Sequence, residues 1–233
     1  MENNKNTLGM IILALAILGA GIAVSMGLQT LKADQRTVSV RGLSEREFSA
    51  DLAIWPVIFN ISGNELPVIR QDIVTKTEII KQYLIDHKIK AEEITVKEPT
   101  ITDIAANPYM EQKKYKYFAK VVLFVRSTDV AAVTSALRDS IDLMDSGIAI
   151  TNDYEGQVQY LFTALNDVKP EMIAEATQNA RKAAEQFAHD SGSQVGKIRK
   201  ASQGLFSIED AATGLPERKT VRVVTTVEYI LTD

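Results

Sequence analysis

The chain has 233 residues, of which 45% are hydrophobic and 24% charged, as is typical of a folded globular protein. Its 26 Lys and Arg against 30 Asp and Glu give a net charge of −4, which argues against a protein that binds a nucleic-acid backbone through a basic face. The absence of cysteine excludes disulfides, thiolate metal sites and cysteine nucleophiles, and two histidines leave little scope for an imidazole-rich metal site.

The first expected element is a membrane-spanning helix over Leu8–Leu28, a run without any charged residue. At 1.5 Å per residue this run is about 30 Å long, which matches the hydrocarbon thickness of a bilayer. Gly21-Ile22-Ala23 and Ala23-Val24-Ser25 both offer small residues for signal-peptidase cleavage. The run is longer than a usual signal-peptide core and only Lys5 precedes it as a basic side chain. We therefore favour an uncleaved anchor and keep a cleaved signal as the alternative.

The charges beside this run do not fix its orientation. Lys32, Arg36 and Arg41 follow it, which would place the C-terminal side in the cytoplasm, but long domains cross membranes largely regardless of charge. We expect residues 1–32 to be an N-terminal membrane anchor or signal segment, and residues 33–233 to form one exported domain.

The domain is expected to begin with strands and one helix. Residues 37–42 predict a short strand, and Leu43-Ser44-Glu45-Arg46-Glu47 a polar turn. Residues 50–62 predict a longer strand in which Pro56 indicates an edge position or a bulge. Asn64 and Pro67 then predict a helix that runs to about His87. Its apolar residues keep helical spacing: Leu66, Ile69, Ile73, Ile80 and Leu84.

A hairpin and a second helix are expected next. Residues 93–105 and 114–127 alternate as two strands joined by a turn at Asn107-Pro108. The second helix runs from Asp129 to about Met144, is capped by Asp129 or Thr128, and ends at Gly147. Residues 147–165 predict a strand region that is broken near 152–156.

The last third predicts a helix followed by two strands. Pro170 in a first turn with Glu171 predicts a helix start, and Gly192 its end. A narrow apolar stripe on this helix is expected to face inward, at Ile173, Ala176, Ala180, Ala183 and Phe187. Strands are predicted over 197–208 and 219–232. Because hairpins alternate with helices, the fold class is predicted as α+β with antiparallel β-sheets, with strand pairs alternating with helices, preceded by the N-terminal transmembrane helix.

No catalytic, cofactor-binding or metal site is predicted. His87 and His189 end helices, where a histidine interacts favourably with the helix dipole, and this interpretation is favoured over catalysis. Asp139, Asp142 and Asp145 could bind a cation, but a solvated helix face is the favoured interpretation. Exposure to solvent is enough to explain Glu92 and Glu93. Trp55 with Pro56 could stack on a ligand, and the tyrosines Tyr115 and Tyr117 could face a partner, but core or edge packing is the commoner role.

Three stretches carry a family resemblance. The Ala-rich helix and Gly-Lys of residues 180–198, the opening strand of residues 38–51 and the closing strand of residues 221–231 resemble the bacterial SIMPL-domain family. The opening strand keeps only one of that family's glycines, Gly42, and Ala50 stands where proline is common. The resemblance covers roughly residues 37–233 and implies the fold and a location in the bacterial cell envelope, with the anchor in the inner membrane and the domain facing the periplasm, or released into the periplasm if the segment is cleaved. Relatives are periplasmic or outer-membrane immunogenic proteins, proteins linked to oxidative stress, and ring-forming oligomers, and none supplies catalytic residues.

The function expected is that of a non-enzymatic, membrane-anchored protein of the bacterial cell envelope that self-associates or scaffolds other components, with a stress-related role implied by the resemblance. A homo-oligomer is expected, without cofactors or nucleic acid, and any other protein partner is unspecified. The alternative is a periplasmic module that binds a small molecule or a stress signal, with a pocket near Trp55 or the tyrosine strand. A carboxylate-based hydrolase is the least favoured hypothesis, because it needs two converging acidic groups with shifted pKa values.

Overall fold

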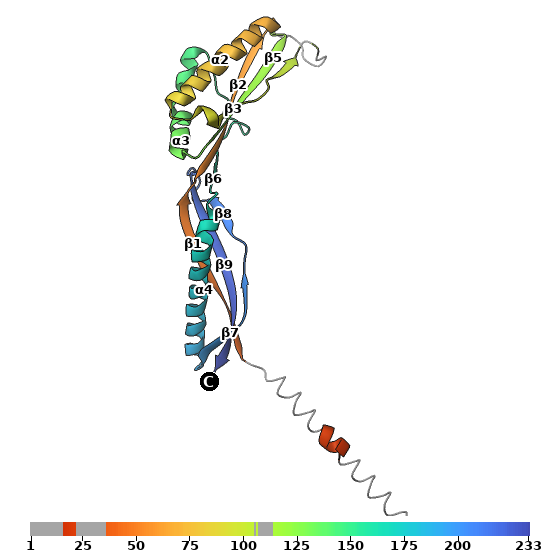
Figure 1. The fold of residues 1–233 in the computed structure, drawn as a ribbon, viewed down its shortest axis with the longest axis vertical. Coiled ribbons are helices and arrows are strands. Elements are labelled where there is room, and N and C mark those ends of the chain that lie inside the picture. The colour runs from red at the N-terminus through yellow and green to blue at the C-terminus, as the bar shows by residue number, and fades with distance from the viewer. Residues whose placement is uncertain (1–15, 22–35, 105, 107–113) are drawn as a thin grey trace, which may run out of the picture. The chain divides into compact units, whose positions relative to one another are not determined.

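A computed structural model describes residues 16–21, 36–104, 106 and 114–233 (Figure 1). The chain forms two compact units. The first unit comprises Met1–Gly42, Gln178–Ser202 and Thr226–Asp233, and the second comprises Leu43–Thr177 and Gln203–Thr225. We describe the interior of each unit separately.

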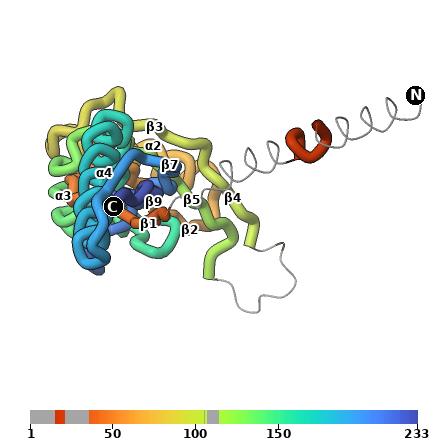
Figure 2. The backbone as a smooth tube through the Cα atoms, turned by 90° about the horizontal axis from the view of Figure 1, so that it is seen from below, coloured from red at the N-terminus to blue at the C-terminus, as the bar shows by residue number. Residues whose placement is uncertain are grey.

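The second unit is built on a five-stranded antiparallel sheet with helices on one face. The strand order is β3-β5-β2-β6, and β4 also pairs with β5. Figure 2 shows β4 running beside β5. The helices that pack on this sheet are α2 (Leu66–Asp86) and α3 (Val130–Asp139). The strands are β2 (Leu52–Gly63), β3 (Ile94–Val96), β4 (Thr100–Asp103), β5 (Tyr117–Ser127) and β6 (Gln159–Leu161).

The main hydrophobic core lies between this sheet and α2 and α3. Trp55 of β2 stands opposite Val125 of β5, and the alternating pattern of β5 places Val121, Leu123 and Val125 on the covered face. Three aliphatic side chains of α2 complete the core and are 0–1% exposed: Ile69, Ile80 and Leu84. Each such side chain contributes roughly 1.5–3 kcal/mol through its removal from water. The predicted helix over residues 64–87 and the buried face of the second hairpin strand are thereby confirmed.

Pro56 occupies a gap in the pairing along one edge of β2. Leu52, Ala53 and Ile54 pair with β6, and further along the strand Phe59 bridges to Ile150. Proline cannot donate a ladder hydrogen bond, so a position between these two paired stretches accommodates it. The predicted edge strand is wrong, because β2 lies between β5 and β6 in the strand order, and a local gap on the β6 side accommodates the proline instead.

The chain between β5 and β6 follows the prediction closely. Asp129 caps α3, because its carboxylate accepts a hydrogen bond from the N–H of Ala132 at 3.0 Å. The 3-10 helix η2 (Ser140–Ser146) extends α3 and ends at Gly147, whose φ of 69° is the left-handed conformation that glycine adopts without strain. The turn predicted at Asn107-Pro108 lies outside the described residues.

A second sheet has the order β1-β9-β7, with β8 also paired to β9. The helix α4 (Leu165–Asp190) covers one face of it through small side chains. In the first unit, Ala180 and Ala184 pack against Val40, Val227 and Tyr229. In the second unit, the N-terminal part of α4 packs on the same strand through its own cluster, Met172, Ala176, Val221 and Val223. The strands are β1 (Thr37–Ser49), β7 (Gln194–Gln203), β8 (Ser207–Asp210) and β9 (Arg218–Thr232).

The predicted polar turn over residues 43–47 is wrong, because these residues continue β1. Glu45 and Glu47 are exposed, whereas Ser44 and Arg46 alternate with them on the opposite face and bind carboxylates of the helix α4 (Leu165–Asp190), so both faces of this strand segment carry polar residues. A single long strand therefore replaces the expected strand and turn.

The predicted start of the third helix at Pro170 is also wrong. The helix α4 begins five residues earlier and contains Pro170 in its interior. The carboxylate of Asp51 accepts hydrogen bonds from the N–H groups of Thr163 and Ala164, at 2.7 and 2.8 Å, just before the helix. These bonds supply the acceptor that a helix start requires, from a residue far away in the sequence.

The apolar stripe of α4 differs from the predicted one at its C-terminal end. Ala176 and Ala180 are buried as predicted, but the stripe continues through Ala184 and Ala188 rather than Ala183 and Phe187. Phe187 is 61% exposed. The buried positions thus recur every four residues, and not in the alternation of three and four that was assumed.

The predicted membrane span lies mostly outside the described residues. Only residues 16–21 of Leu8–Leu28 are described, as a helical segment with exposed side chains. Within the described part of the chain, no helix is long and apolar enough to cross a bilayer.

Candidate functional site

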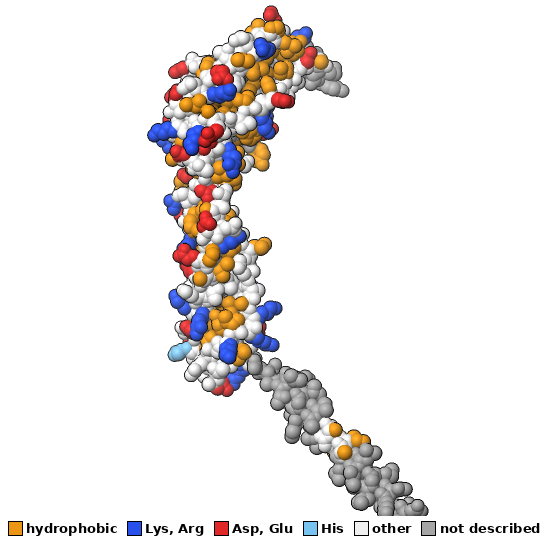
Figure 3. Space-filling view, in the orientation of Figure 1, with side chains coloured by type: hydrophobic (Ala, Val, Ile, Leu, Met, Phe, Trp, Pro, Cys, Tyr) orange, Lys and Arg blue, Asp and Glu red, His pale blue; other side chains and the backbone are white. Residues whose placement is uncertain are grey.

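An apolar groove lies between α2 and β4 in the second unit. Its volume is about 610 Å³, and seven residues line it: Leu66, Pro67, Arg70, Ile73, Val74, Pro99 and Ile101. Leu66, Val74 and Ile101 are each 46–50% exposed and line the same groove, so they form one exposed apolar patch and not isolated exposed residues. Figure 3 shows hydrophobic side chains gathered beside α2 in this unit. The groove is therefore an exposed apolar surface of the size that small ligands occupy.

The groove arises because α2 has more apolar residues than the core can cover. Ile69, Ile80 and Leu84 point into the core, whereas Leu66 and Val74, two turns apart, lie on a neighbouring stripe of the same helix. The strand opposite this stripe is β4, all four of whose residues are exposed. A short edge strand cannot cover the stripe, so apolar side chains remain in contact with solvent.

Arg70 is the only charged side chain among the described residues that line the groove. Its neighbours at three and four positions along α2 are Leu66, Pro67, Ile73 and Val74, none of which is acidic. Among the described residues, no carboxylate lies within salt-bridge distance of its guanidinium group. The groove thus combines an apolar lining with one uncompensated positive charge.

A second candidate surface is the outer edge of β7. This strand ends the order β1-β9-β7, and no described strand pairs with its far side. All but two of its ten residues are exposed. Three cations fall within four residues: Lys197, Arg199 and Lys200. At the other end of the order, β1 also lacks an outer partner strand among the described residues and exposes Glu45 and Glu47.

The third candidate site is a cleft of about 460 Å³ beside His87. The Nδ1 atom of His87 is 2.8 Å from the carbonyl oxygen of Tyr83, and its Nε2 atom is 3.4 Å from a carboxylate oxygen of Asp139. The hydroxyl of Ser135 donates to the same oxygen of Asp139 at 3.3 Å. The carboxylate therefore lies between serine and histidine, whereas a catalytic triad places the histidine between the other two. This arrangement favours the predicted role of His87 at a helix end.

Tyr83 adds a structural hydrogen bond next to this cleft. Its hydroxyl donates to the carbonyl oxygen of Ala136 at 2.6 Å and ties α2 to α3. Burial, together with the nearby carboxylates of Asp139 and Asp142, raises the pKa of Tyr83 to about 12. The phenol therefore stays protonated at physiological pH and keeps donating.

A polar cluster holds the N-terminal half of α4 to β1. Arg46 forms salt bridges to Glu171 at 2.9 Å and to Glu175 at 2.8 Å, and the hydroxyl of Ser44 donates to Glu175 at 3.0 Å. The hydrogen bond from Ser44, followed by that from Arg46, lowers the pKa of Glu175. These groups satisfy one another, which makes the cluster structural.

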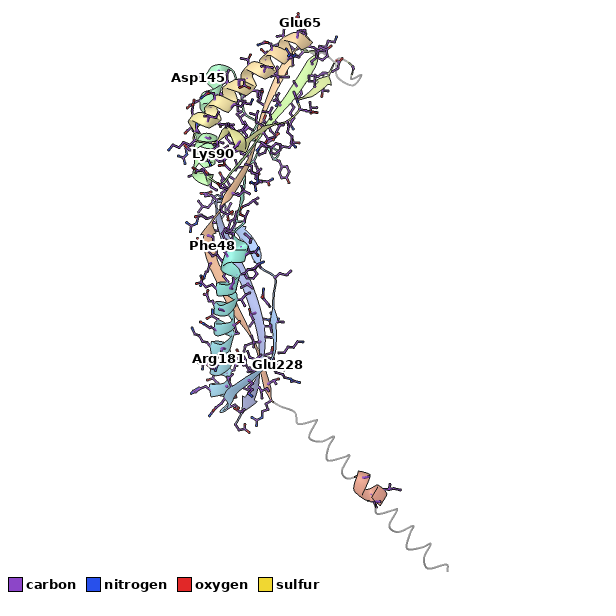
Figure 4. The ribbon with its side chains drawn as sticks, viewed as in Figure 1. Phe48, Glu65, Lys90, Asp145, Arg181 and Glu228 are labelled. Carbon is purple, nitrogen blue, oxygen red and sulfur yellow. The ribbon has the colours of Figure 1, made fainter. Side chains whose placement is uncertain are left out.

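The pKa of Asp51 is lowered as well. Burial acts to raise it, but the hydrogen bonds from the N–H groups of Thr163 and Ala164 outweigh that effect. Phe48 and Phe162 stack close to this cap, with ring centroids 4.9 Å apart (Figure 4 labels Phe48).

Trp55 and the two tyrosines differ in how deeply they are buried. Trp55 is completely buried in the core, and its indole N–H has no partner among the described residues. Tyr117 is partly buried against the same core, whereas Tyr115 is 39% exposed. Trp55 therefore packs in the core, and no surface cavity is formed by its ring.

The remaining candidate residues are dispersed. His189 is exposed at the end of α4, with Nδ1 3.4 Å from Asp190. Glu92 and Glu93 lie in the short helix η1 (Ala91–Glu93). Asp139, Asp142 and Asp145 lie along α3 and η2 (Figure 4 labels Asp145), and within the described ranges no group of three or more His, Asp or Glu is placed to hold a metal ion.

Sequence reasoning missed both the groove and the importance of β7. Leu66 and Ile73 were identified as apolar positions of the helix, but their exposure depends on which strand lies opposite them. A signal was present in Val74, an apolar residue outside the predicted buried stripe. For β7, the signal was the run of cations on a strand that would otherwise be expected to pair on both sides.

The family comparison agrees with the fold. Residues 38–229 match the family model SIMPL, described as a protein of unknown function (DUF541). The chain belongs to the SIMPL family. No curated protein matches the sequence. The match spans both units, including the opening strand β1 and most of β9, which are two of the stretches that carried the resemblance.

Proposed function

We propose that this SIMPL protein is a non-enzymatic, membrane-anchored component of the bacterial cell envelope, whose domain of residues 33–233 lies in the periplasm and self-associates. The anchor is proposed to be Leu8–Leu28, because its uncharged length suits a bilayer. A cleaved signal in the same position would leave the domain in the periplasm without an anchor. The clusters with shifted pKa values, at Asp51, Arg46 and Glu175, support a non-enzymatic role, because their partners are structural.

The observation that carries self-association is the pair of open edges of one sheet. Both β1 and β7 are long strands, of 13 and 10 residues, without an outer partner strand in the part of the chain that the structure describes. Unpaired N–H and C=O groups along such edges readily accept a further strand. A second copy of the chain offers the matching edge.

The charges of the edges favour pairing of unlike edges. Lys197, Arg199 and Lys200 would repel one another if two β7 strands met, whereas Glu45 and Glu47 of β1 would attract them. The present partners of these glutamates, Arg222 and Arg218, are about half exposed, so the ion pairs are weak and exchangeable. Pairing of β7 with β1 of the next copy is a head-to-tail contact, which generates a ring when it closes.

The test is the mass of the full chain in a non-ionic detergent, measured by light scattering coupled to size-exclusion chromatography. We expect a single closed oligomer, and a monomer at high concentration would contradict the proposal. Replacing Lys197 and Lys200 together by Glu should dissociate the oligomer. The matched control is Lys182→Glu on the exposed side of α4, which should leave the mass unchanged.

The anchor is tested separately. An uncleaved anchor predicts that the protein stays in membranes after alkaline carbonate extraction and keeps its N-terminal methionine or the residue that follows it. Release into the soluble periplasmic fraction with a new N-terminus near Ala23 or Ser25 would instead support the cleaved signal. A cytoplasmic location, shown by protease protection in spheroplasts, would contradict both.

A second candidate function is a small-molecule binding module in the periplasm. The observation that favours it is the apolar groove between α2 and β4, and not a pocket at Trp55. Self-association and ligand binding use different surfaces, so either function can hold without the other.

A further inference from the structure

We propose that the groove between α2 and β4 binds one single-chain anionic amphiphile, a free long-chain fatty acid. This inference rests on the second candidate function, since it names the ligand class of a binding module, and it does not depend on self-association.

The apolar lining sets the nature of most of the ligand. Six of the seven lining residues are aliphatic or proline, and the volume of about 610 Å³ lies well inside the range of roughly 300–1,000 Å³ that small ligands occupy. Among the described lining residues, no side chain other than Arg70 is charged or polar, so a ligand with polar groups along its length would lose hydrogen bonds to water without replacement. A hydrocarbon chain meets this requirement.

Arg70 sets the nature of the other end. Its guanidinium group carries a permanent charge, and no carboxylate lies within salt-bridge distance of it among the described residues. Because its neighbours on α2 are apolar, the aliphatic part of its side chain can lie along the groove while the charged end remains in water. A carboxylate at the end of a hydrocarbon chain would pair with this charge in a bidentate manner.

The groove suits one chain better than a membrane phospholipid. A phospholipid brings two acyl chains and a phosphodiester, whereas the groove offers one apolar volume and one cation. The free fatty acid is therefore the occupant to which the proposal commits, and a phospholipid is an outcome of the test.

The experiment uses the full chain in nanodiscs of phosphatidylcholine, because the Leu8–Leu28 segment would bind amphiphiles nonspecifically in solution. The probe is hexadecanoic acid with a photoreactive diazirine on its chain, and labelled positions are mapped by tryptic mass spectrometry. We expect labelling of the peptide that ends at Lys76 and of the one that begins at Glu98, since these contain Val74 and Ile101. Labelling confined to the Leu8–Leu28 peptide, or spread evenly, would overturn the proposal.

The charge is tested with a matched pair of arginine variants. Arg70→Gln should reduce labelling of the groove peptides by the acid about fivefold, as expected for a partly exposed ion pair, and should not affect labelling by the corresponding fatty alcohol. The control, Arg126→Gln, removes an exposed arginine from β5 outside the groove and should change neither. An equal loss of labelling by acid and alcohol in the Arg70 variant would contradict a role for the charge.

The apolar wall is tested with a matched pair of valine variants on α2. Val74 lines the groove and is 50% exposed, and Val68 does not line it and is 53% exposed. Val74→Asp should abolish groove labelling, and Val68→Asp should retain it, while the emission of the single tryptophan, Trp55, verifies that both variants are folded. Equal labelling of the two variants would overturn the proposal.

Competition distinguishes the sources of the ligand. Unlabelled dodecanoate should displace the probe, and decanoate, which is two methylene groups shorter, should need about a fifteenfold higher concentration, because each methylene group changes affinity about fourfold. Displacement by phosphatidylglycerol in the nanodisc at levels where dodecanoate has no effect would assign the groove to membrane lipid and contradict the proposal. The oligomer mass of the same samples reports separately on self-association.

Discussion

The helices α2 and α4 both cover one face of an antiparallel sheet, but with side chains of different size. Beneath α2 the contacts are made by Ile69, Ile80 and Leu84, and beneath α4 by alanines, Ala180 and Ala184 in the first unit. The starts of the helices also differ. Glu65 before α2 makes no side-chain capping hydrogen bond (Figure 4), whereas α4 starts at the remote carboxylate of Asp51. One helix is held by apolar volume, and the other by close approach and polar contacts at its start.

The largest expected effect tests the dependence of α2 on apolar volume. Leu84→Ala should lower the free energy of unfolding by about 2–5 kcal/mol, because Leu84 is 0% exposed and its truncation leaves a cavity. Urea unfolding followed by Trp55 fluorescence measures this, since the only tryptophan lies in the same core. Val68→Ala, at a 53% exposed position of the same helix, should change it by less than about 0.5 kcal/mol. Equal effects of the two variants would contradict the view that buried apolar side chains hold α2 on its sheet.

The next effect tests whether α4 requires small side chains. Ala184 is 0% exposed, and Ala184→Leu should destabilise the packing of α4 on its sheet by about 1–3 kcal/mol through overpacking. Hydrogen exchange of the α4 and β9 peptides should rise correspondingly. The control is Ala174→Leu on the exposed side of α4, which should leave exchange unchanged. Tolerance of Leu at position 184 would mean that α4 does not approach its sheet as closely as described.

A smaller effect is expected from the remote cap of α4. Asp51→Ala should lower stability by about 0.5–2 kcal/mol, because the N–H groups of Thr163 and Ala164 lose their acceptor. The loss should appear as faster hydrogen exchange in the first turns of α4. Asp72→Ala, which removes a half-buried carboxylate of α2 without a salt bridge among the described residues, should have little effect. An unchanged exchange rate in the Asp51 variant would show that the helix start does not depend on this residue.

The smallest effect concerns the pH dependence of the Arg46–Glu175 cluster. The pKa of Glu175 in the folded protein is lowered below its ordinary value of 4.5, so its contribution to stability is present above that value and is lost as pH falls through the folded pKa. Glu175→Gln should therefore be less stable than the unchanged protein at pH 7, with a difference that shrinks towards pH 3. Urea midpoints at several pH values measure this. A difference that grew on acidification would have the wrong sign.

Much of the fold could be predicted from local patterns. The limits of α2, the cap at Asp129 and the buried face of β5 follow from features within a few residues, such as alternation and capping side chains. The start of α4 could not be predicted, because its acceptor, Asp51, is more than one hundred residues away in the sequence. The continuation of β1 through residues 43–47 was missed because its covered face is also polar there: Ser44 and Arg46 bind carboxylates of α4, which lie far away in the sequence.

The candidate site was less predictable than the fold, for a related reason. The apolar character of Leu66 and Ile73 is visible in the sequence, but whether a residue is covered depends on the strand that packs against it. The same holds for β7, whose open edge is a property of strand order and not of its composition. Such surfaces arise where no helix or strand covers an apolar stripe or pairs with a strand edge. Local sequence patterns do not show which elements lie opposite one another.

The alanines of α4 recur at a fixed interval: Ala176, Ala180, Ala184 and Ala188. Shifting such a helix along its axis by four residues, about 6 Å, with a rotation of about 40° about the axis, would place each alanine where its neighbour had been. The alanine stripe by itself therefore does not distinguish between these positions of α4 along its axis. Met172 distinguishes between these positions by its size. Asp51 and Arg46 distinguish between them because their hydrogen-bonding and salt-bridge partners lie only near the helix start. The polar contacts of α4 thus fix its axial position: they select one position of the helix among several that its alanines would accept.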